Sequence, residues 1–421
     1  MYKSIAIATL FFGIVTTASS VESTHKNTSG LSAERLQRVT TVLDKYITAN
    51  DISGSVSLVY RHGQIAYFEA RGYQDLETKT PMRRDSIFAM ASMTKPVTVV
   101  ATMILVEEGK IRLDDPIDKF LPELTNPKVL NRPDGPLSEV HPSPRAITLR
   151  DLLMYRMGIG WPEASRVPSN APIAKAHAQV QTPEQTGDEF MKALGALPLV
   201  YEPGYQFMYN TPSLVLSVLI ERVSGQPLDK FMDERIFKPL GMKDTGFYVP
   251  DDKRARFATI YVAGPTTGTI VPEKDSAQRM LKPPVFPSGA GGLVSTANDY
   301  LKFARMMLGG GTVDGVRILS RKSIELMTQD HMTPAQHEMF WALPGWWSEG
   351  GFGFGVQVRS KQSRLGPSPG SYNWNGSSGV AWMVDPKEDL IYLRLIQRKG
   401  LLPGGPFEQD FETAVYQSIV D

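Results

Sequence analysis

Two residues in the segment 85–96 have side chains that could perform acyl transfer: Ser92 and Lys95. Proline fits an α-helix only within its first turn, so Pro96 predicts a helix start that places Ser92 and Lys95 on one face. A serine hydroxyl becomes a nucleophile when a neighbouring base removes its proton. A lysine shielded from water shifts toward its neutral form, which can be that base. The backbone N–H groups of the same turn could hold an oxyanion.

This pair alone does not establish a site, because a capping serine and a solvated lysine also occur at ordinary helix starts. Two later segments add to it. The segment 202–211 leads into a predicted helix with Tyr209 at its mouth, and the glycine-rich segment 369–379 leads into a predicted strand. Taken singly, the aromatic residues of these segments would be assigned to the core or to an edge strand.

The order of the three motifs resembles the serine β-lactamase and penicillin-binding-protein superfamily. These motifs are Ser-x-x-Lys, a proline-glycine pair with a tyrosine five residues after the glycine, and an x-x-Gly strand opening. The closest resemblance is to the branch related to class C β-lactamases, and within it to the family VIII carboxylesterases. The resemblance extends from about Leu31 to the end of the chain, and it includes the flanking stretches 86–108, 147–153, 291–307 and 382–390.

The resemblance implies a role for each matching residue. Ser92 corresponds to the nucleophile that forms an acyl-enzyme, and Lys95 to the neighbouring base. Tyr209 corresponds to the tyrosine whose hydroxyl shuttles the proton, as a phenolate stabilised by the lysine charge. The backbone N–H groups of Ser92 and Ser377 correspond to the oxyanion hole.

Departures from the family pattern indicate the substrate. Thr211 stands where the lactamases have asparagine or serine, and the triplet 374–376 replaces their lysine-threonine-glycine. Tryptophan offers one N–H and no charge, so an anionic lactam would lose a charge-assisted hydrogen bond worth about 1.5–3 kcal/mol. We therefore predict a pocket for neutral acyl esters, with Thr211, Trp374 and Gly376 binding substrate. The segment 155–158, which replaces a histidine-threonine-serine-glycine motif, is assigned no function.

A second aromatic segment, Trp341 to Trp347, has two open interpretations: aromatic walls of the pocket, or a solvent-side loop packed on the sheet. Its sequence does not decide between them.

The helices and strands that the sequence pattern indicates, and that must position these residues, are those of an α+β fold. Apolar residues at helical spacing predict a helix in 31–49, a helix after Pro96 ending near Gly109, and a closing helix at 406–419. The predicted strands are 54–60, 64–70, 351–356, 379–384 and 390–395. Shorter helices are predicted at 149–154, 214–224, 297–308 and 322–329. Strands at both ends of the chain favour one antiparallel sheet flanked by helices, with an inserted, mainly helical lobe.

The domain boundaries follow from composition. Residues 1–20 have a basic start, an apolar stretch and small residues, which is typical of a secretory signal cleaved after Ala18 or Ser20, with Ser20 favoured. The apolar stretch is too short to span a bilayer. A linker at 21–30 follows. The sheet domain is assigned to 31–120 and 283–421, and the helical lobe to 121–282. We therefore expect a periplasmic or secreted protein without membrane insertion after cleavage.

The charge balance argues against two classes of partner. The 45 basic and 44 acidic residues form no basic stripe, so nucleic acid and anionic membranes are poor partners. No cofactor or metal site is predicted, because His331 and His337 match no common ligand spacing and the other histidines lie in no recognisable site context. No G-x-S-x-G pattern and no cysteine occur.

The sequence therefore predicts an exported serine hydrolase that acts through an acyl-enzyme, specifically a carboxylesterase on small acyl esters. The alternatives are a β-lactamase or D-amino-acid peptidase on cell-wall-like amides, and acyl transfer to an alcohol. A catalytically idle penicillin-binding sensor or scaffold is a further alternative, against which the intact Ser92, Lys95 and Tyr209 argue. The sequence leaves the acyl chain length and the oligomeric state open.

Overall fold

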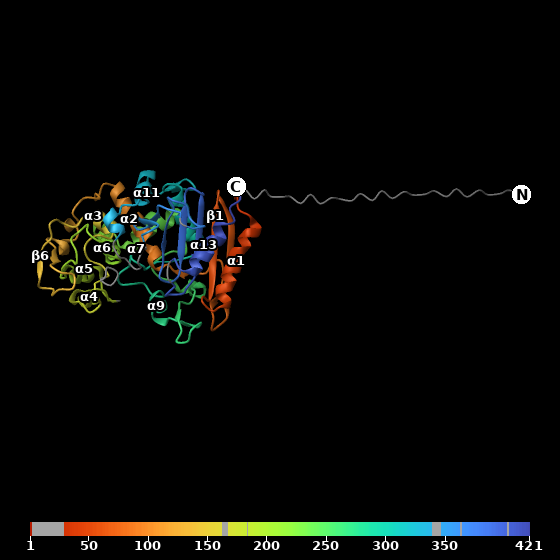
Figure 1. Cartoon of the computed structure of the whole chain (residues 1–421), viewed down its shortest axis with the longest axis horizontal. Helices are drawn as coiled ribbons and strands as arrows, with labels where there is room; N and C mark the ends of the chain where they lie inside the picture. Colours follow the sequence, from red (N-terminus) through yellow and green to blue (C-terminus); the bar gives the residue numbers. More distant parts are fainter. Residues whose placement is uncertain (2–28, 162–166, 183, 339–346, 363, 402–403) are drawn as a thin grey trace.

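One antiparallel sheet of eight strands forms the centre of the protein (Figure 1). The computed structural model describes residue 1 and residues 29–161, 167–182, 184–338, 347–362, 364–401 and 404–421. The strand order is β12-β13-β14-β15-β16-β1-β2-β3. These strands are β1 (Gly54–Arg61), β2 (Gln64–Asp75), β3 (Thr80–Pro81), β12 (Gly350–Phe352), β13 (Gln357–Arg359), β14 (Tyr372–Asn375), β15 (Ala381–Asp385) and β16 (Leu390–Leu395).

The two ends of the chain meet inside this sheet, where β1 pairs with β16 in a register that sets Val56 opposite Leu395. Successive side chains of a strand point to opposite faces. Accordingly Leu58 belongs to the large core, and its neighbour Val59 to a second core on the other face. The α+β class and the sheet built from both chain ends are thus confirmed.

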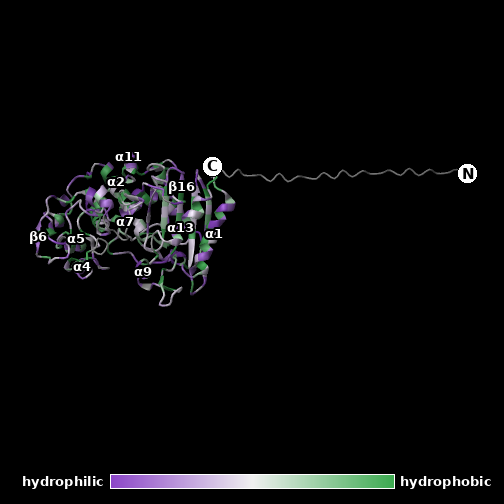
Figure 2. Cartoon of the chain, viewed as in Figure 1, coloured by the Kyte–Doolittle hydropathy of each residue, from purple (hydrophilic) through white to green (hydrophobic). Residues whose placement is uncertain are grey.

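Helices cover both faces of the sheet. On one face α1 packs against α13, and on the other α10 packs against β1, β15 and β16. Helix α1 begins at the capping side chain of Ser32, and Leu36, Val39 and Leu43 recur along its buried side. Figure 2 shows both hydrophilic and hydrophobic residues along this helix. The helices of the sheet region are α1 (Ala33–Thr48), α2 (Thr94–Glu107), α10 (Ala297–Leu308), α11 (Arg321–Met327), α12 (Pro334–His337) and α13 (Pro406–Tyr416).

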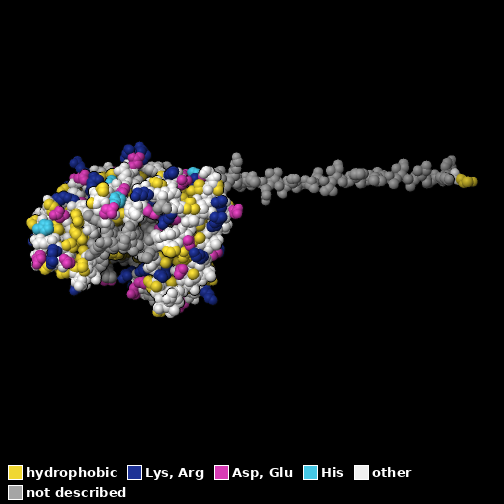
Figure 3. All heavy atoms as spheres, viewed as in Figure 1, with side chains coloured by type: hydrophobic (Ala, Val, Ile, Leu, Met, Phe, Trp, Pro, Cys, Tyr) yellow, Lys and Arg dark blue, Asp and Glu magenta, His cyan; other side chains and the backbone are white. Residues whose placement is uncertain are grey.

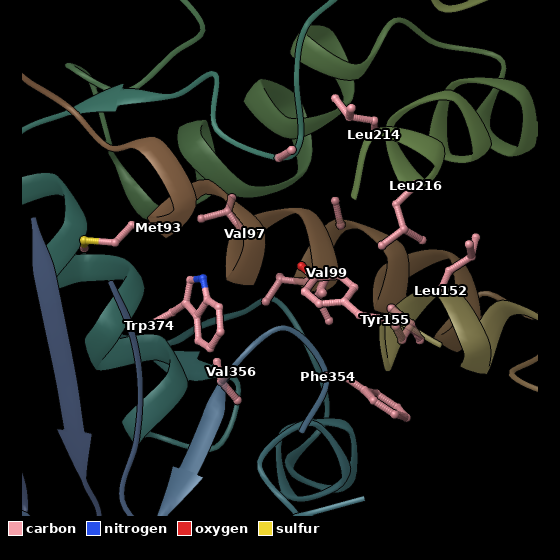
Figure 4. Packing of buried hydrophobic residues seen from close by; sticks show 14 of the residues in the cluster. Met93, Val97, Val99, Leu152, Tyr155, Leu214, Leu216, Phe354, Val356 and Trp374 are labelled. Atoms are coloured by element: carbon pink, nitrogen blue, oxygen red, sulfur yellow. The ribbon is translucent and has the colours of Figure 1, made fainter. Parts of the chain in front are cut away.

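Short helices and loops follow between α2 and α10, many of them at the end of the molecule away from α1 (Figure 1). They are α3 (Leu149–Leu153), α4 (Pro172–His177), α5 (Gly187–Gly195), α6 (Thr211–Ser224), α7 (Leu228–Met232), α8 (Lys238–Leu240) and α9 (Lys274–Arg279). Helix α6 packs on α2, α3 and α5. Figure 4 shows part of the resulting core, with Leu216 next to α2.

Several short strands in two-stranded pairs complete the fold. They are β4 (Phe88–Ala89), β5 (Lys128–Leu130), β6 (Val140–Pro142), β7 (Tyr261–Ala263), β8 (Ile270–Pro272), β9 (Val294–Ser295), β10 (Thr312–Val313) and β11 (Val316–Arg317). The β5–β6 and β7–β8 pairs within the lobe were not predicted from the sequence. The proposed boundaries of the sheet domain and the lobe remain predictions.

One predicted strand is wrong in detail. The segment 351–356 was expected to be continuous, but β12 ends at Phe352 and β13 begins at Gln357. Gly353 donates a backbone hydrogen bond to Val356 across a turn, and Gly355 has a φ of +74°, which favours glycine. The glycines therefore form a turn rather than a strand.

The predicted signal segment lies outside the described residues. In the part of the chain that the structure describes, no helix is both long and apolar enough to span a bilayer. Figure 3 shows acidic and basic side chains interspersed over the visible face, in keeping with the formal net charge of +1.

Candidate active site

The segment that carries Ser92 is fixed at both of its ends. Strand β4 pairs with β9, and the N–H of Met90 donates to the carbonyl of Leu293 at 2.8 Å. Ala91 then has a φ of +45°, a left-handed conformation that costs a non-glycine residue free energy and occurs preferentially at functional sites. This bend turns the chain from β4 into a 3₁₀ turn, Ala91–Met93, that continues as α2. Pro96 lies in the first turn of α2, as predicted.

Ser92, Lys95 and Tyr209 are in direct contact. The Nζ atom of Lys95 lies 2.9 Å from Ser92 Oγ, and the Tyr209 hydroxyl donates a 2.7 Å hydrogen bond to the same oxygen. Lys95 Nζ also donates to the carbonyl of Ala290 at 2.5 Å. The structure therefore brings a hydroxyl, an amine and a phenol around one oxygen atom, in an order that permits proton transfer between them.

Burial shifts Lys95 toward its neutral, basic form. Its side chain is 1% exposed, and in the described part of the chain no carboxylate forms an ion pair with it. Desolvation disfavours the ammonium form and lowers the pKa of Lys95 well below its usual value. This shift increases the neutral fraction of Lys95, which is the form that can accept the Ser92 proton.

Tyr209 differs in one respect from the expectation drawn from the sequence. Burial raises its pKa to about 12, while hydrogen bonds with Ser92 and Trp374 act in the opposite direction. The phenolate stabilised by lysine charge is therefore not the resting form, because Lys95 is itself driven toward neutrality. In the resting site Tyr209 is a proton donor.

An aromatic shell surrounds the Tyr209 ring and explains its burial. Tyr155 meets it edge-on at 5.7 Å between centroids, Trp161 at 5.6 Å, and Phe207 stacks on it at 6.3 Å. On another side Trp374 donates from Nε1 to the Tyr209 hydroxyl at 3.3 Å. The shell excludes water from the phenol and fixes its orientation toward Ser92.

The segment 155–158, to which the sequence assigned no function, supports this shell. The Tyr155 hydroxyl is 2.6 Å from Ser213 Oγ, and the Tyr155 carbonyl accepts from the N–H of Met208 at 2.7 Å. Trp347 also belongs to this region, since its buried ring contacts Phe207 at 5.3 Å. This contact places Trp347 in the buried core next to Phe207 and does not decide between the two interpretations of its segment, of which residues 341–346 lie outside the described residues.

A cavity of about 440 Å³ opens beside Ser92. Ser92 and Ser377 both line it, as the predicted oxyanion hole requires. Thr211, Trp374 and Gly376 are not among the described residues that line it, and their assignment to substrate binding stays a prediction.

Two of these residues, Thr211 and Gly376, have a structural role in the site. Thr211 is the first residue of α6, and its hydroxyl is 2.8 Å from Nε2 of His177. A Cβ added to Gly376 would come within 2.5 Å of the Met90 carbonyl oxygen. Gly376 therefore lets the turn after β14 approach the Ser92 segment closely.

The sequence interpretation missed two residues near the site. Trp161, half-exposed at 50%, lines the cavity and contacts the Tyr209 ring. His177 was placed in no site context, yet it contacts the first residue of α6. Neither belongs to a motif with a recognisable spacing, so only the fold reveals them. Among the described residues, no group of three His, Cys, Asp or Glu side chains could hold a metal ion.

Comparison with known proteins yields consistent similarities. The family model described as Beta-lactamase matches residues 39–416. Protein Rv1367c of Mycobacterium tuberculosis is 40% identical over 357 residues, covering 82% of this chain and 86% of the relative. Esterase EstB of Burkholderia gladioli is 28% identical over 408 residues, covering 91% of this chain and 96% of the relative. The solved structure of EstCE1, described as a hydrolase with promiscuous acyltransferase activity, has a TM-score of 0.78 and 28% identity, covering 91% of this chain and 99% of that one.

Proposed function

The chain belongs to the Beta-lactamase family, and we propose that this serine hydrolase is a carboxylesterase that cleaves small acyl esters through an acyl-enzyme on Ser92. The observation that carries the proposal is the contact of Ser92 Oγ with both Lys95 and the Tyr209 hydroxyl inside an aromatic, buried shell. The similarity to Esterase EstB and to EstCE1 supports ester substrates.

The proposed acylation uses Lys95 as the base. Neutral Lys95 accepts the Ser92 proton while Ser92 Oγ attacks the ester carbonyl carbon. The resulting oxyanion accepts hydrogen bonds from the backbone N–H groups of Ser92 and Ser377. Collapse of this intermediate breaks the bond to the alcohol, whose oxygen takes the Tyr209 proton, and the Lys95 ammonium returns a proton to Tyr209.

Deacylation repeats these steps with water. Water replaces the alcohol, gives up a proton through Tyr209 toward Lys95, and attacks the acyl carbon. The Ser92 oxygen leaves and regains its proton, which returns every group to its starting form. An alcohol in place of water would give acyl transfer by the same route.

Esters are favoured over anionic lactams because of Trp374. Its side chain is 4% exposed and contacts the Tyr209 hydroxyl, at the position where the family's lactamases have a lysine. A carboxylate at that position would find one indole N–H, already directed at Tyr209, and no positive charge. A neutral ester needs no such partner.

The test compares turnover of p-nitrophenyl butyrate and of a chromogenic cephalosporin, with Ser92→Ala as the control. We expect ester turnover that disappears in the variant, and little lactam turnover. Efficient hydrolysis of the cephalosporin would contradict the proposal and favour a β-lactamase or peptidase. Ester turnover that persists in Ser92→Ala would contradict the assignment of the nucleophile.

Export is a separate proposal that rests on residues 1–20 alone. A basic start, a short apolar stretch and small residues are the features that a signal peptidase recognises. We expect the mature protein to begin at Val21 and to leave the cytoplasm. Intact mass measurement of the protein after expression in a bacterial host with a periplasm tests this, and an uncleaved cytoplasmic chain would contradict it.

A further inference from the structure

A large aromatic side chain, Trp161, is open to solvent at the cavity beside Ser92. Trp161 lines this cavity and is 50% exposed, whereas Trp347, Trp374 and Trp382 are at most 4% exposed. Ligand cavities are lined largely by apolar and aromatic side chains, which a bound ligand covers. Trp161 therefore offers aromatic surface to a substrate that enters this cavity.

The position of the Trp161 ring is set by the chain around Tyr209. The backbone N–H of Trp161 donates to the Tyr209 carbonyl, and the centroids of the two rings are 5.6 Å apart, with 77° between the ring planes. The preceding residue, Gly160, lies so close to this segment that an added Cβ would come within 2.6 Å of the Met208 carbonyl oxygen. Both the backbone and the ring of Trp161 are therefore fixed relative to Tyr209.

The geometry of acylation decides which part of an ester meets Trp161. The carbonyl oxygen is directed to the backbone N–H groups of Ser92 and Ser377, whereas the alcohol oxygen has to reach the hydroxyl of Tyr209, which protonates it. That hydroxyl is 2.7 Å from Ser92 Oγ, and Trp161 packs on the ring that carries it. The alcohol portion of the ester therefore begins at Tyr209 and continues along the part of the cavity wall that Trp161 forms.

We propose that Trp161 binds the alcohol portion of the ester and makes the enzyme prefer esters of aromatic alcohols, such as benzyl esters. Aromatic rings pair in edge-to-face or offset-stacked geometry, and such a pair contributes free energy beyond the burial of its area. The preferred substrate is thus an uncharged ester with a flat, apolar alcohol. This inference deepens and rests on the proposed carboxylesterase function. It adds a specificity-determining residue from outside the three motifs.

Trp161 also supports the orientation of Tyr209, so its loss has two effects that an experiment must separate. A displaced Tyr209 hydroxyl slows the cleavage of every ester, because that hydroxyl contacts Ser92 Oγ. A lost contact with an aromatic alcohol lowers kcat/KM only for esters of that alcohol. The ratio of kcat/KM between two esters with equally acidic alcohols cancels the first effect and retains the second.

The experiment measures two ratios of kcat/KM by titration of the released acid. Benzyl butyrate over allyl butyrate reports on the alcohol side, because benzyl and allyl alcohol have nearly the same acidity and differ in the aromatic ring. Allyl hydrocinnamate over allyl butyrate places the ring on the acyl side. The ratios are compared among the wild-type protein, Trp161→Phe, Trp161→Leu and Tyr205→Leu. Tyr205 is 55% exposed and absent from the described cavity wall, so its variant controls for the loss of an exposed aromatic side chain.

The inference is supported if Trp161→Leu lowers the alcohol-side ratio by about two- to tenfold while the acyl-side ratio stays unchanged. Trp161→Phe should retain most of the alcohol-side ratio, and Tyr205→Leu should leave both ratios unchanged. The inference is overturned if the alcohol-side ratio in Trp161→Leu equals that of the wild type, if the acyl-side ratio falls as much, or if Tyr205→Leu has the same effect.

If the wild-type protein cleaves none of the three esters, the proposed function fails. The inference is then decided by calorimetric titration of Ser92→Ala, with and without Trp161→Leu, with benzyl butyrate. A weaker affinity in the double variant supports the inference, and equal affinities overturn it.

Discussion

At the scale of single residues, burial shifts the pKa values of Lys95 and Tyr209 so that their uncharged forms are favoured. Lys95 is held without a carboxylate partner in the described part of the chain, and desolvation lowers its pKa. The same desolvation raises the pKa of Tyr209 to about 12. Burial therefore moves the pKa values of an acid and a base in opposite directions, and it shifts both groups toward the neutral forms that proton transfer from Ser92 requires.

The first prediction concerns the pH dependence that this burial creates. Below its lowered pKa Lys95 is protonated and cannot accept the Ser92 proton, so kcat/KM should rise with pH and level off well below the ordinary lysine value of 10.5. Measurement of kcat/KM for p-nitrophenyl butyrate between about pH 5 and 10 tests this. Lys95→Arg, which stays charged throughout, should lose activity by about 10²–10⁴-fold at every pH. A limb centred near 10.5 would contradict a buried, neutral lysine.

The second prediction separates the proton donor from the base. Tyr209→Phe removes the hydroxyl that donates to Ser92 Oγ, so poor leaving groups should suffer most. Ethyl butyrate, whose alkoxide must be protonated, should lose more kcat/KM than p-nitrophenyl butyrate, whose phenolate leaves without a proton, because kcat/KM reports acylation and not the deacylation step that both esters share. Tyr155→Phe is the matched control, because it removes a buried tyrosine hydroxyl that contacts Ser213 instead. Equal losses for both esters in Tyr209→Phe would show that Tyr209 does not protonate the alcohol.

At the scale of elements, three separate segments have to converge on Ser92. Strand β4 and the left-handed Ala91 present the serine, the start of α6 presents Tyr209, and the turn after β14 approaches from the sheet. Ser378 fastens this turn by donating from its hydroxyl to the Ala89 carbonyl at 2.7 Å. The positions of the reacting groups relative to one another thus depend on the contacts between these three segments.

A single added methyl group should loosen this convergence. In Gly376→Ala the new Cβ would meet the Met90 carbonyl oxygen at 2.5 Å, so the turn that carries Ser377 must move away from Ser92. We expect kcat to fall on the order of 10²-fold, the effect of losing one oxyanion donor, with a smaller change in KM. Gly366→Ala, whose Cβ would find no atom nearer than 3.6 Å, should retain wild-type kinetics. Wild-type kcat in Gly376→Ala would argue against Ser377 as an oxyanion donor.

The sequence predicted the elements better than their environment. The proline in the first turn of α2 and the apolar periodicity of α1 located those helices closely, because local sterics and burial decide them. The motif order also brought Ser92, Lys95 and Tyr209 together correctly. It could not predict that Trp161 or Arg279 would border the cavity, since neither has a sequence pattern that depends on this contact. The burial of Tyr209 was likewise not predictable, because it depends on the whole aromatic shell.

At the scale of the whole molecule, the sheet separates two cores. The larger core includes α2 and the aromatic shell behind Tyr209, whereas the smaller one lies between the sheet and the pair α1 and α13. Each core packs on one face of the sheet in which β1 and β16, from the two ends of the chain, are paired. Both cores therefore stabilise the same sheet. Among the described residues, the larger core alone contains a reacting group, Tyr209. Substitutions of the same size in the two cores should therefore lower the free energy of unfolding alike, whereas only those in the larger core should also lower kcat.

A pair of phenylalanines tests this separation. Phe352 and Phe411 are both fully buried, the first in the larger core and the second in the smaller core. Replacing either by alanine should lower the free energy of unfolding by about 3–5 kcal/mol. Phe352 also packs against Tyr155 and Trp374, at 5.1 and 5.4 Å between ring centroids, and both of these rings contact Tyr209. Phe352→Ala should therefore also lower kcat.

The measurement combines urea unfolding with kinetics at a temperature where both variants remain folded. We expect Phe411→Ala to keep wild-type kcat for p-nitrophenyl butyrate despite its lower stability, because its ring contacts Tyr392 on the far face of the sheet. Phe352→Ala, at comparable stability, should lose kcat because the Tyr209 hydroxyl is no longer held toward Ser92. Equal kcat losses in the two variants would mean that the site senses global stability rather than its own aromatic shell.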